Sequence, residues 1–258
     1  MTPGEPPVVR TDTHERTLVM TIDRPGARNA VDSRVAHGLA DAVRRLEEDP
    51  GLRVGVLTGS EGVFSAGMDL KAAANGDSAD VEGAGFAGLT EREPGKPLIA
   101  AVEGYAMGGG FEMALACDLV VAGTGAKFAL PEVKRGLIAG GGGAARLPSR
   151  IPYHLAMELI LTGDPITAER AAELGLVNRV TTDGAAEQEA LNLAARLTEN
   201  APLAVSAAKR ISRLAAHESE RRALEAQRGE IRELLRSEDF AEGARAFAER
   251  RAPSWSAR

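Results

Sequence analysis

The chain has 258 residues, 44% of them hydrophobic and 26% charged, with a formal net charge of -6. Such a chain can bury a sizeable core, and its negative charge gives no general attraction to nucleic acid or anionic membranes, so we expect neither as a partner. No apolar run is long enough to span a bilayer, and the N-terminal residues lack the apolar centre of a signal peptide. We therefore expect a cytoplasmic protein.

The first 60 residues alternate between apolar strands and one amphipathic helix. Residues 16–23 and 53–58 have the apolar density of strands. Between them, Asp32 or Ser33 can cap a helix whose apolar residues recur at helical spacing: Val35, Leu39, Val43 and Leu46. This order favours an α/β or mixed layered fold.

The chain is organised around the glycine-rich stretch of residues 103–119. Residues 97–102 before it suit a strand buried on both faces, and a helix is expected to start near Gly108. Three consecutive glycines, Gly108–Gly110, indicate a close approach to the main chain, either by a ligand or by a tightly packed sheet. The free amides at the helix start can stabilise negative charge. Glu112 beside them is a candidate general base, or only complements the helix dipole.

Two further glycine loops, residues 59–70 and 140–143, flank this region. The latter lacks the spacing and lysine of a phosphate-binding loop. Residues 72–96 are poor in large apolar groups, and we expect a mobile surface segment. Within it, residues 83–88 match G-x-G-x-x-G, but no strand precedes them and no helix follows, which argues against dinucleotide binding. Glu132, held in a defined direction by Pro131, is either a functional carboxylate or a solvated loop acid.

The sequence gives little support for a metal site, a nucleophilic serine or a reactive cysteine. The histidines His14, His37, His154 and His217 are scattered, so we expect no metal site. Ser65 does not stand in a G-x-S-x-G turn. Cys117 lies in an apolar run, where a core role is the simplest interpretation. From residue 152 the pattern is mainly helical, with a short apolar segment at 177–180 and a helical appendage that starts near Ala201.

Five segments, in this order and spacing, resemble the enoyl-CoA hydratase/isomerase, or crotonase, family: residues 24–30, 64–70, 104–112, 128–132 and 161–178. The resemblance covers residues 16–252. It implies an α/β fold with a spiral of repeated ββα units and a C-terminal helical domain. It places the core, with acyl-CoA binding and catalysis, in residues 1–200 and a helical oligomerisation region in 201–258. It also implies a homotrimer or homohexamer.

The family's catalytic groups map onto four residues by position. The resemblance implies that the amides of Met68 and Gly109 form the oxyanion hole, and that Glu112 and Glu132 are the paired acids. It thus implies an enoyl-CoA hydratase, a lyase of fatty acid metabolism that adds water syn across the C2=C3 bond of a 2-enoyl-CoA. Coenzyme A is then part of the substrate, and no separate cofactor is expected.

The resemblance also implies a substrate-binding set along the CoA path and near the C-terminus: Gly26, Ala27, Arg28, Ala30, Ala66, Asp69, Leu70, Lys71, Phe247 and Arg250. The last two can reach a neighbouring subunit, or are simply a core aromatic and a surface cation. Met68 replaces a frequent small residue, and the glycines of residues 140–143 depart from the common hydratase loop. The motifs GGGFE and FALPE also resemble the branch that acts on carnitinyl-CoA. Alternatives are therefore a carnitinyl-CoA dehydratase-like activity, an enoyl-CoA isomerase, or a non-catalytic acyl-CoA binder.

Overall fold

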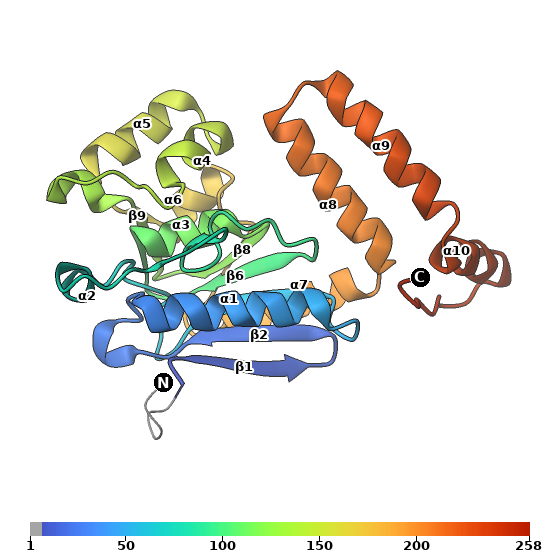
Figure 1. Ribbon diagram of the computed structural model, residues 1–258, viewed down its shortest axis with the longest axis horizontal. Coiled ribbons are helices and arrows are strands. Elements are labelled where there is room, and N and C mark those ends of the chain that lie inside the picture. The colour runs from blue at the N-terminus through green and yellow to red at the C-terminus, as the bar shows by residue number, and fades with distance from the viewer. Residues whose placement is uncertain (1–6) are drawn as a thin grey trace.

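The computed structural model describes residues 7–258 and has a six-stranded main sheet. Figure 1 shows part of this sheet with α1 beside it. The strand order is β1-β2-β3-β6-β8-β11. β1 and β2 form an antiparallel hairpin, and the remaining neighbours pair in parallel. The strands are β1 (Val9–His14), β2 (Thr17–Ile22), β3 (Val54–Gly59), β6 (Leu98–Val102), β8 (Leu119–Gly123) and β11 (Arg179–Thr181).

A second, smaller sheet gives the fold its spiral. It contains β7 (Tyr105–Met107), β9 (Lys127–Ala129) and β10 (Ile166–Thr167), in the order β10-β9-β7. Each turn runs from a main strand to this sheet and then into a helix, as in β6, β7 and α3 (Gly109–Ala116). After β3, Ser65 makes an isolated bridge to Ala106 in the same way. The expected α/β fold with repeated ββα units is confirmed.

Both faces of the main sheet pack against a hydrophobic core, which explains why its strands are apolar along their whole length. On one face, Leu18, Met20 and Ile22 pack in the large core under α1 (Ser33–Glu48). On the other, alternate strand residues such as Val19 and Val56 pack against the alanines of α7 (Ala186–Thr198). Because side chains alternate along a strand, one strand serves both cores.

The other helices surround the small sheet and form the C-terminal part. Those near the small sheet are η1 (Pro25–Ala27), α2 (Leu70–Ala74), η2 (Pro131–Arg135), α4 (Gly143–Arg150), α5 (Tyr153–Thr162) and α6 (Ala168–Glu173). The C-terminal helices are α8 (Pro202–His217), α9 (Glu220–Leu234) and α10 (Glu238–Glu249), where α8 and α9 form a hairpin (Figure 1). α8 begins next to the expected boundary at residue 201, and the division into domains stays a prediction. No helix within residues 7–258 is long and apolar enough to cross a membrane.

The sequence places one segment correctly only in part and misses one strand. Most of residues 72–83 lie at the surface as expected, but residues 84–90 are buried: β4 (Asp80–Val81) and β5 (Gly85–Phe86) form a hairpin, and Phe86 and Leu89 lie in the main core. Small residues there permit close packing, since a Cβ on Gly88 would lie 2.5 Å from the Ala36 carbonyl oxygen of α1. Strand β1 was not expected, because all its residues after Val9 are exposed and give no apolar pattern.

We expect Asp32→Ala to lower the free energy of unfolding by about 0.5 to 2 kcal/mol, the range for loss of a helix cap. Asp32 caps α1 by accepting a 3.0 Å hydrogen bond from the Val35 amide, and its other oxygen lies 3.4 Å from Arg24. Urea unfolding followed by circular dichroism measures the change. The matched control is Asp41→Ala on the exposed face of α1, whose ion pair with Arg44 is solvated. Equal unfolding midpoints for the two variants would contradict the capping role.

Candidate active site

The three glycines at the start of α3 allow three segments to pack against one helix N-terminus. A Cβ on Gly108 would lie 2.9 Å from Glu132 Oε1, and one on Gly109 would lie 2.4 Å from the Phe86 ring. On Gly110 it would lie 2.4 Å from the Ser65 carbonyl oxygen. Tight packing therefore accounts for Gly110, whereas Gly108 and Gly109 also line a cavity.

The two residues expected to supply an oxyanion hole belong to segments that pack against each other. Gly67, just before Met68, has φ +85°, and a Cβ on it would lie 2.9 Å from the Gly109 nitrogen. Within residues 7–258, neither amide donates to a backbone carbonyl or a side chain. Both residues line the same cavity. Two unpaired amides at one site can stabilise a negatively charged oxygen.

Backbone hydrogen bonds hold the Met68 turn against the chain after η1. The Val31 amide donates to Gly67 O (2.8 Å), and the Asp69 amide donates to Val31 O (2.9 Å). The Ala66 amide donates to Arg28 O (3.0 Å). Because these bonds lie on both sides of Met68, they fix the direction of its amide.

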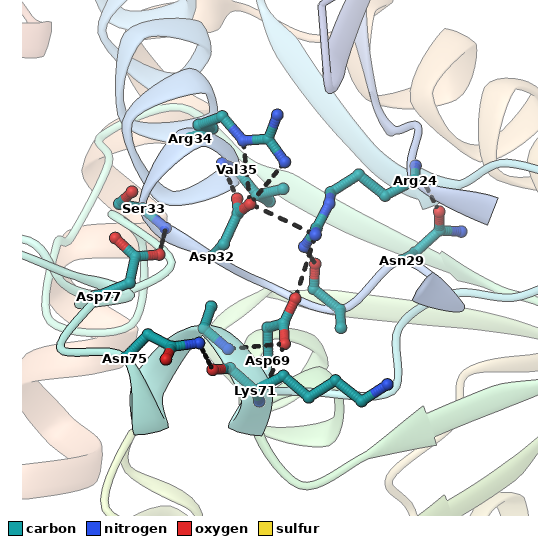
Figure 2. Close-up of polar contacts among 12 residues, drawn as sticks. Arg24, Asn29, Asp32, Ser33, Arg34, Val35, Asp69, Lys71, Asn75 and Asp77 are labelled. Atoms are coloured by element: carbon teal, nitrogen blue, oxygen red, sulfur yellow. Dashed lines mark hydrogen bonds and ion pairs between the residues drawn. The ribbon is translucent and has the colours of Figure 1, made fainter. Parts of the chain in front are cut away.

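Arg24 connects the same two segments through its side chain (Figure 2). Its guanidinium donates to Ala30 O (2.6 Å) and to Asp69 Oδ2 (3.0 Å). Asp69 also caps α2, where the Ala72 amide hydrogen bond and then Arg24 lower the pKa of its carboxyl group. Asp69 was expected along the CoA path, and its side chain is engaged in this network.

Glu112 is a buried carboxyl group, 3% exposed, on the first turn of α3. Its Oε1 accepts a 2.8 Å hydrogen bond from the Gly143 amide. The pKa of Glu112 is raised to about 7, mainly by burial and also by the charge of Glu132, while hydrogen bonds from Gly143 and Gly141 and the charge of Arg146 limit the rise. A carboxyl group with a pKa near neutrality can both accept and donate a proton.

Glu132 approaches the cavity from η2, where Pro131 occupies the first helical position. Burial raises the pKa of Glu132, against a hydrogen bond from its own backbone and the charge of Arg135. Its Oε2 is buried and has no hydrogen-bond partner within residues 7–258. A buried oxygen without a partner costs stability and is typical of a site that awaits a ligand. The alternative of a solvated loop acid does not describe this half-buried side chain.

The cavity between these groups has a volume of about 680 Å³, within the range of small-molecule sites. Of the expected binding residues, Arg28, Ala66 and Leu70 line it together with all four expected catalytic residues. The others do not line it in this chain: Gly26, Ala27, Ala30, Asp69, Lys71, Phe247 and Arg250. Phe247 is 89% exposed on α10, so its contact with a neighbouring subunit stays a prediction.

Several wall residues were not expected from the sequence. Phe86 reaches the cavity from the buried part of residues 72–96, and Leu137 and Ile138 reach it from the loop after η2. Phe86 is the only aromatic residue in 72–96, which is the one signal that marked it. Cys117 is buried as expected, and burial raises the pKa of its thiol to about 12, so it is not a reactive thiolate.

We expect Glu112→Gln to remove a pH-dependent loss of stability. A raised folded-state pKa means that stability falls as the pH rises from 4.5 towards about 7, because the unfolded chain releases this proton first. The wild-type chain should therefore lose roughly 2 kcal/mol more than the variant between about pH 5 and about pH 8. Urea unfolding at the two pH values measures this difference. Glu158→Gln, at an exposed position of α5, should follow the wild type; identical profiles for all three proteins would contradict the assignment.

Comparisons with known proteins give the family. A family model described as enoyl-CoA hydratase/isomerase matches residues 12–258. A carnitinyl-CoA dehydratase from Salmonella typhi is 44% identical over 249 residues, which cover 93% of this chain and 95% of that protein. The carnitinyl-CoA dehydratase from Proteus mirabilis is 41% identical over 254 residues, with coverage of 95% and 97%.

Solved structures agree with this match. An enoyl-CoA hydratase from Mycobacterium tuberculosis H37Rv has a TM-score of 0.96 and 53% identity and covers 98% of this chain and 100% of its own. A carnitinyl-CoA hydratase from Mycobacterium avium has a TM-score of 0.80 and 45% identity, with the same coverage. The spiral fold, the paired carboxyl groups and these matches lead to one conclusion: the chain belongs to the enoyl-CoA hydratase/isomerase family.

Proposed function

We propose that the chain is a lyase that adds or removes water between C2 and C3 of an acyl-CoA thioester, with a carnitinyl-CoA-like 3-hydroxyacyl-CoA as its preferred substrate. The observation that carries the reaction class is that Glu112 and Glu132 reach one cavity beside two unpaired amides. The preference for this substrate draws on the names of the curated relatives, which are carnitinyl-CoA dehydratases. The sequence motifs alone favour hydration of a fatty enoyl-CoA and give the carnitinyl-CoA activity only as an alternative.

The amides of Met68 and Gly109 would receive the thioester oxygen. Removing a proton from C2, or adding water at C3, moves negative charge onto that oxygen. Two preoriented amides stabilise this charge more than water does, and loss of one such donor typically costs about 2.7 to 4 kcal/mol of barrier. The bonds of Val31 to both sides of Met68 supply the required rigidity.

The two carboxyl groups would divide the proton transfers. In dehydration, Glu132 takes the C2 proton, and Glu112 gives a proton to the C3 hydroxyl group, which leaves as water. In hydration, Glu112 with Glu132 holds the water and Glu112 takes its proton as it attacks C3, while Glu132 returns a proton to C2. Both directions need one protonated and one ionised carboxyl group, and the raised pKa values of both favour that state near neutral pH.

The paired acids also bear on the other candidate functions. An isomerase moves one proton along the acyl chain and needs one carboxyl group, so a second buried acid would have no task. A non-catalytic binder would gain nothing from two carboxyl groups in one cavity whose pKa values are both raised by burial. Water addition to a fatty 2-enoyl-CoA remains the second candidate, because the 53% identical solved structure is named an enoyl-CoA hydratase.

Assembly and CoA recognition are proposed on the same basis. Arg28 lines the cavity, and it would meet CoA phosphates together with Lys71. A homotrimer or homohexamer would cover the exposed apolar side chains of α9 and α10, such as Ile231, Phe240 and Phe247. The C-terminal helices would then form the contact between subunits.

The substrate preference can be measured directly. We expect the purified chain to dehydrate carnitinyl-CoA with a kcat/KM at least about tenfold above that for hydration of crotonyl-CoA, since roughly 1.4 kcal/mol of differential binding suffices for this ratio. Product identification by mass spectrometry distinguishes dehydration from isomerisation. A higher kcat/KM for crotonyl-CoA would favour hydration of a fatty 2-enoyl-CoA instead. No turnover of either thioester would favour a non-catalytic acyl-CoA binder.

The acid–base role of Glu132 can be tested by Glu132→Gln. We expect kcat to fall by about 10²- to 10⁴-fold with little change in KM, because the amide keeps the shape of the side chain but cannot transfer the C2 proton. The exposed Glu158→Gln on α5 is the control and should leave both constants unchanged. A Glu132→Gln variant that retains kcat within about tenfold would show that another group transfers this proton.

A further inference from the structure

Arg146 of α4 reaches two loops that enclose Glu112. Its Nη1 donates a 3.2 Å hydrogen bond to Gly141 O, and its Nη2 donates to Thr90 O. Thr90 ends the turn that starts at Phe86, whose carbonyl oxygen accepts the Thr90 amide at 3.1 Å. Because a guanidinium is a rigid planar fork, one side chain can hold both loops at a fixed separation.

The glycine loop of residues 140–143 leaves room for this guanidinium. Gly142 has φ +107°, and a Cβ on it would lie only 1.8 Å from Arg146 Nη1. The next residue, Gly143, donates its amide to Glu112 Oε1 at 2.8 Å. A continuous series of contacts therefore runs from the guanidinium through Gly142 and Gly143 to the Glu112 carboxylate.

The second loop, the turn from Phe86 to Thr90, forms part of the cavity wall through Phe86. The ring of Phe86 packs on Gly109, and its Cβ lies 3.2 Å from where a Cβ on Gly141 would stand. The Phe86 turn thus contacts both the glycine loop and the start of α3. If the two loops separated, Glu112 would lose its amide partner and its shield from water.

Arg146 also places a positive charge near Glu112. Burial lowers the pKa of Arg146, but an arginine stays protonated at physiological pH. Its charge lowers the pKa of Glu112, as does the Gly143 hydrogen bond. The other charge that acts on Glu112 is Glu132 from η2. The other charges that act on Arg146 are Glu91 from the loop after β5, Arg150 from α4 and Arg213 from α8.

We propose that Arg146 is a positioning residue for Glu112: its guanidinium ties the Phe86–Thr90 turn to the Gly140–Gly143 loop and so fixes the Gly143 amide on the carboxylate. Arg146 does not line the cavity, so it acts through the loop rather than on the substrate. The kinetic consequence rests on the proposed function, whereas the effect on the titration of Glu112 does not.

The test compares Arg146→Gln, Arg146→Lys and the matched control Arg150→Gln, an exposed arginine on the same helix. In Arg146→Gln we expect the pKa of Glu112 to rise by about half a unit or more, since both the charge and the amide hydrogen bond are lost. We expect kcat to fall by about 10- to 100-fold while KM changes by less than about threefold, the signature of a misplaced catalytic group. Arg146→Lys keeps the charge but not the fork, so the Glu112 pKa should rise less than in Arg146→Gln, while kcat should still fall. Arg150→Gln should match the wild type in both.

The Glu112 titration is read from the ¹³C carboxyl resonance that disappears in Glu112→Gln, and circular dichroism checks that each variant is folded. A folded Arg146→Gln with unchanged Glu112 pKa and unchanged kcat overturns the proposal. If Arg146→Gln does not fold, Arg146→Lys decides, because full kcat with lysine would show that the fork is not needed. If the wild type turns over no acyl-CoA, the proposed function fails, and the Glu112 titration alone still decides the role of Arg146.

Discussion

The close approach of separate loops to the N-terminus of α3 is the constraint on which the site depends. Gly108 and Gly109 leave room for Glu132 and the Phe86 ring, and Gly67 brings the Met68 turn beside the helix. A methyl group at any of these positions would collide with an atom of the site. The free amides, the aromatic wall and the second acid therefore share one space because three residues have no side chains.

Burial of the two acids has a cost in stability that their proposed task explains. Glu112 is shielded from water and keeps one amide partner, and Glu132 has a buried oxygen with no partner among the described residues. Shielding favours the protonated form and raises both pKa values towards neutrality. The same desolvation that weakens the fold at high pH prepares a proton donor and acceptor near neutral pH.

Polar networks outside the cavity hold its parts in place. Arg24 donates hydrogen bonds to the Asp69 carboxylate (Figure 2) and to the Ala30 carbonyl oxygen. Arg146 joins two loops that contact Glu112 or its amide partner. Each arginine satisfies carbonyl oxygens of irregular backbone that no strand or helix could pair, which is how loops reach the rigidity of a scaffold.

The sequence by itself determined the strands 17–22, 54–59 and 98–102, helix α1 with its Asp32 cap, and the two glutamates and glycine run that mark the family, since these depend on local patterns and motif spacing. Only the tertiary structure decided that exposed β1 pairs with β2, that residues 84–90 are buried, and that Phe86 and Arg146 contact the loops around Glu112. These features depend on contacts between residues distant in sequence. An exposed strand, a turn of small residues or a lone arginine carries no periodic signal of the partner that it will meet.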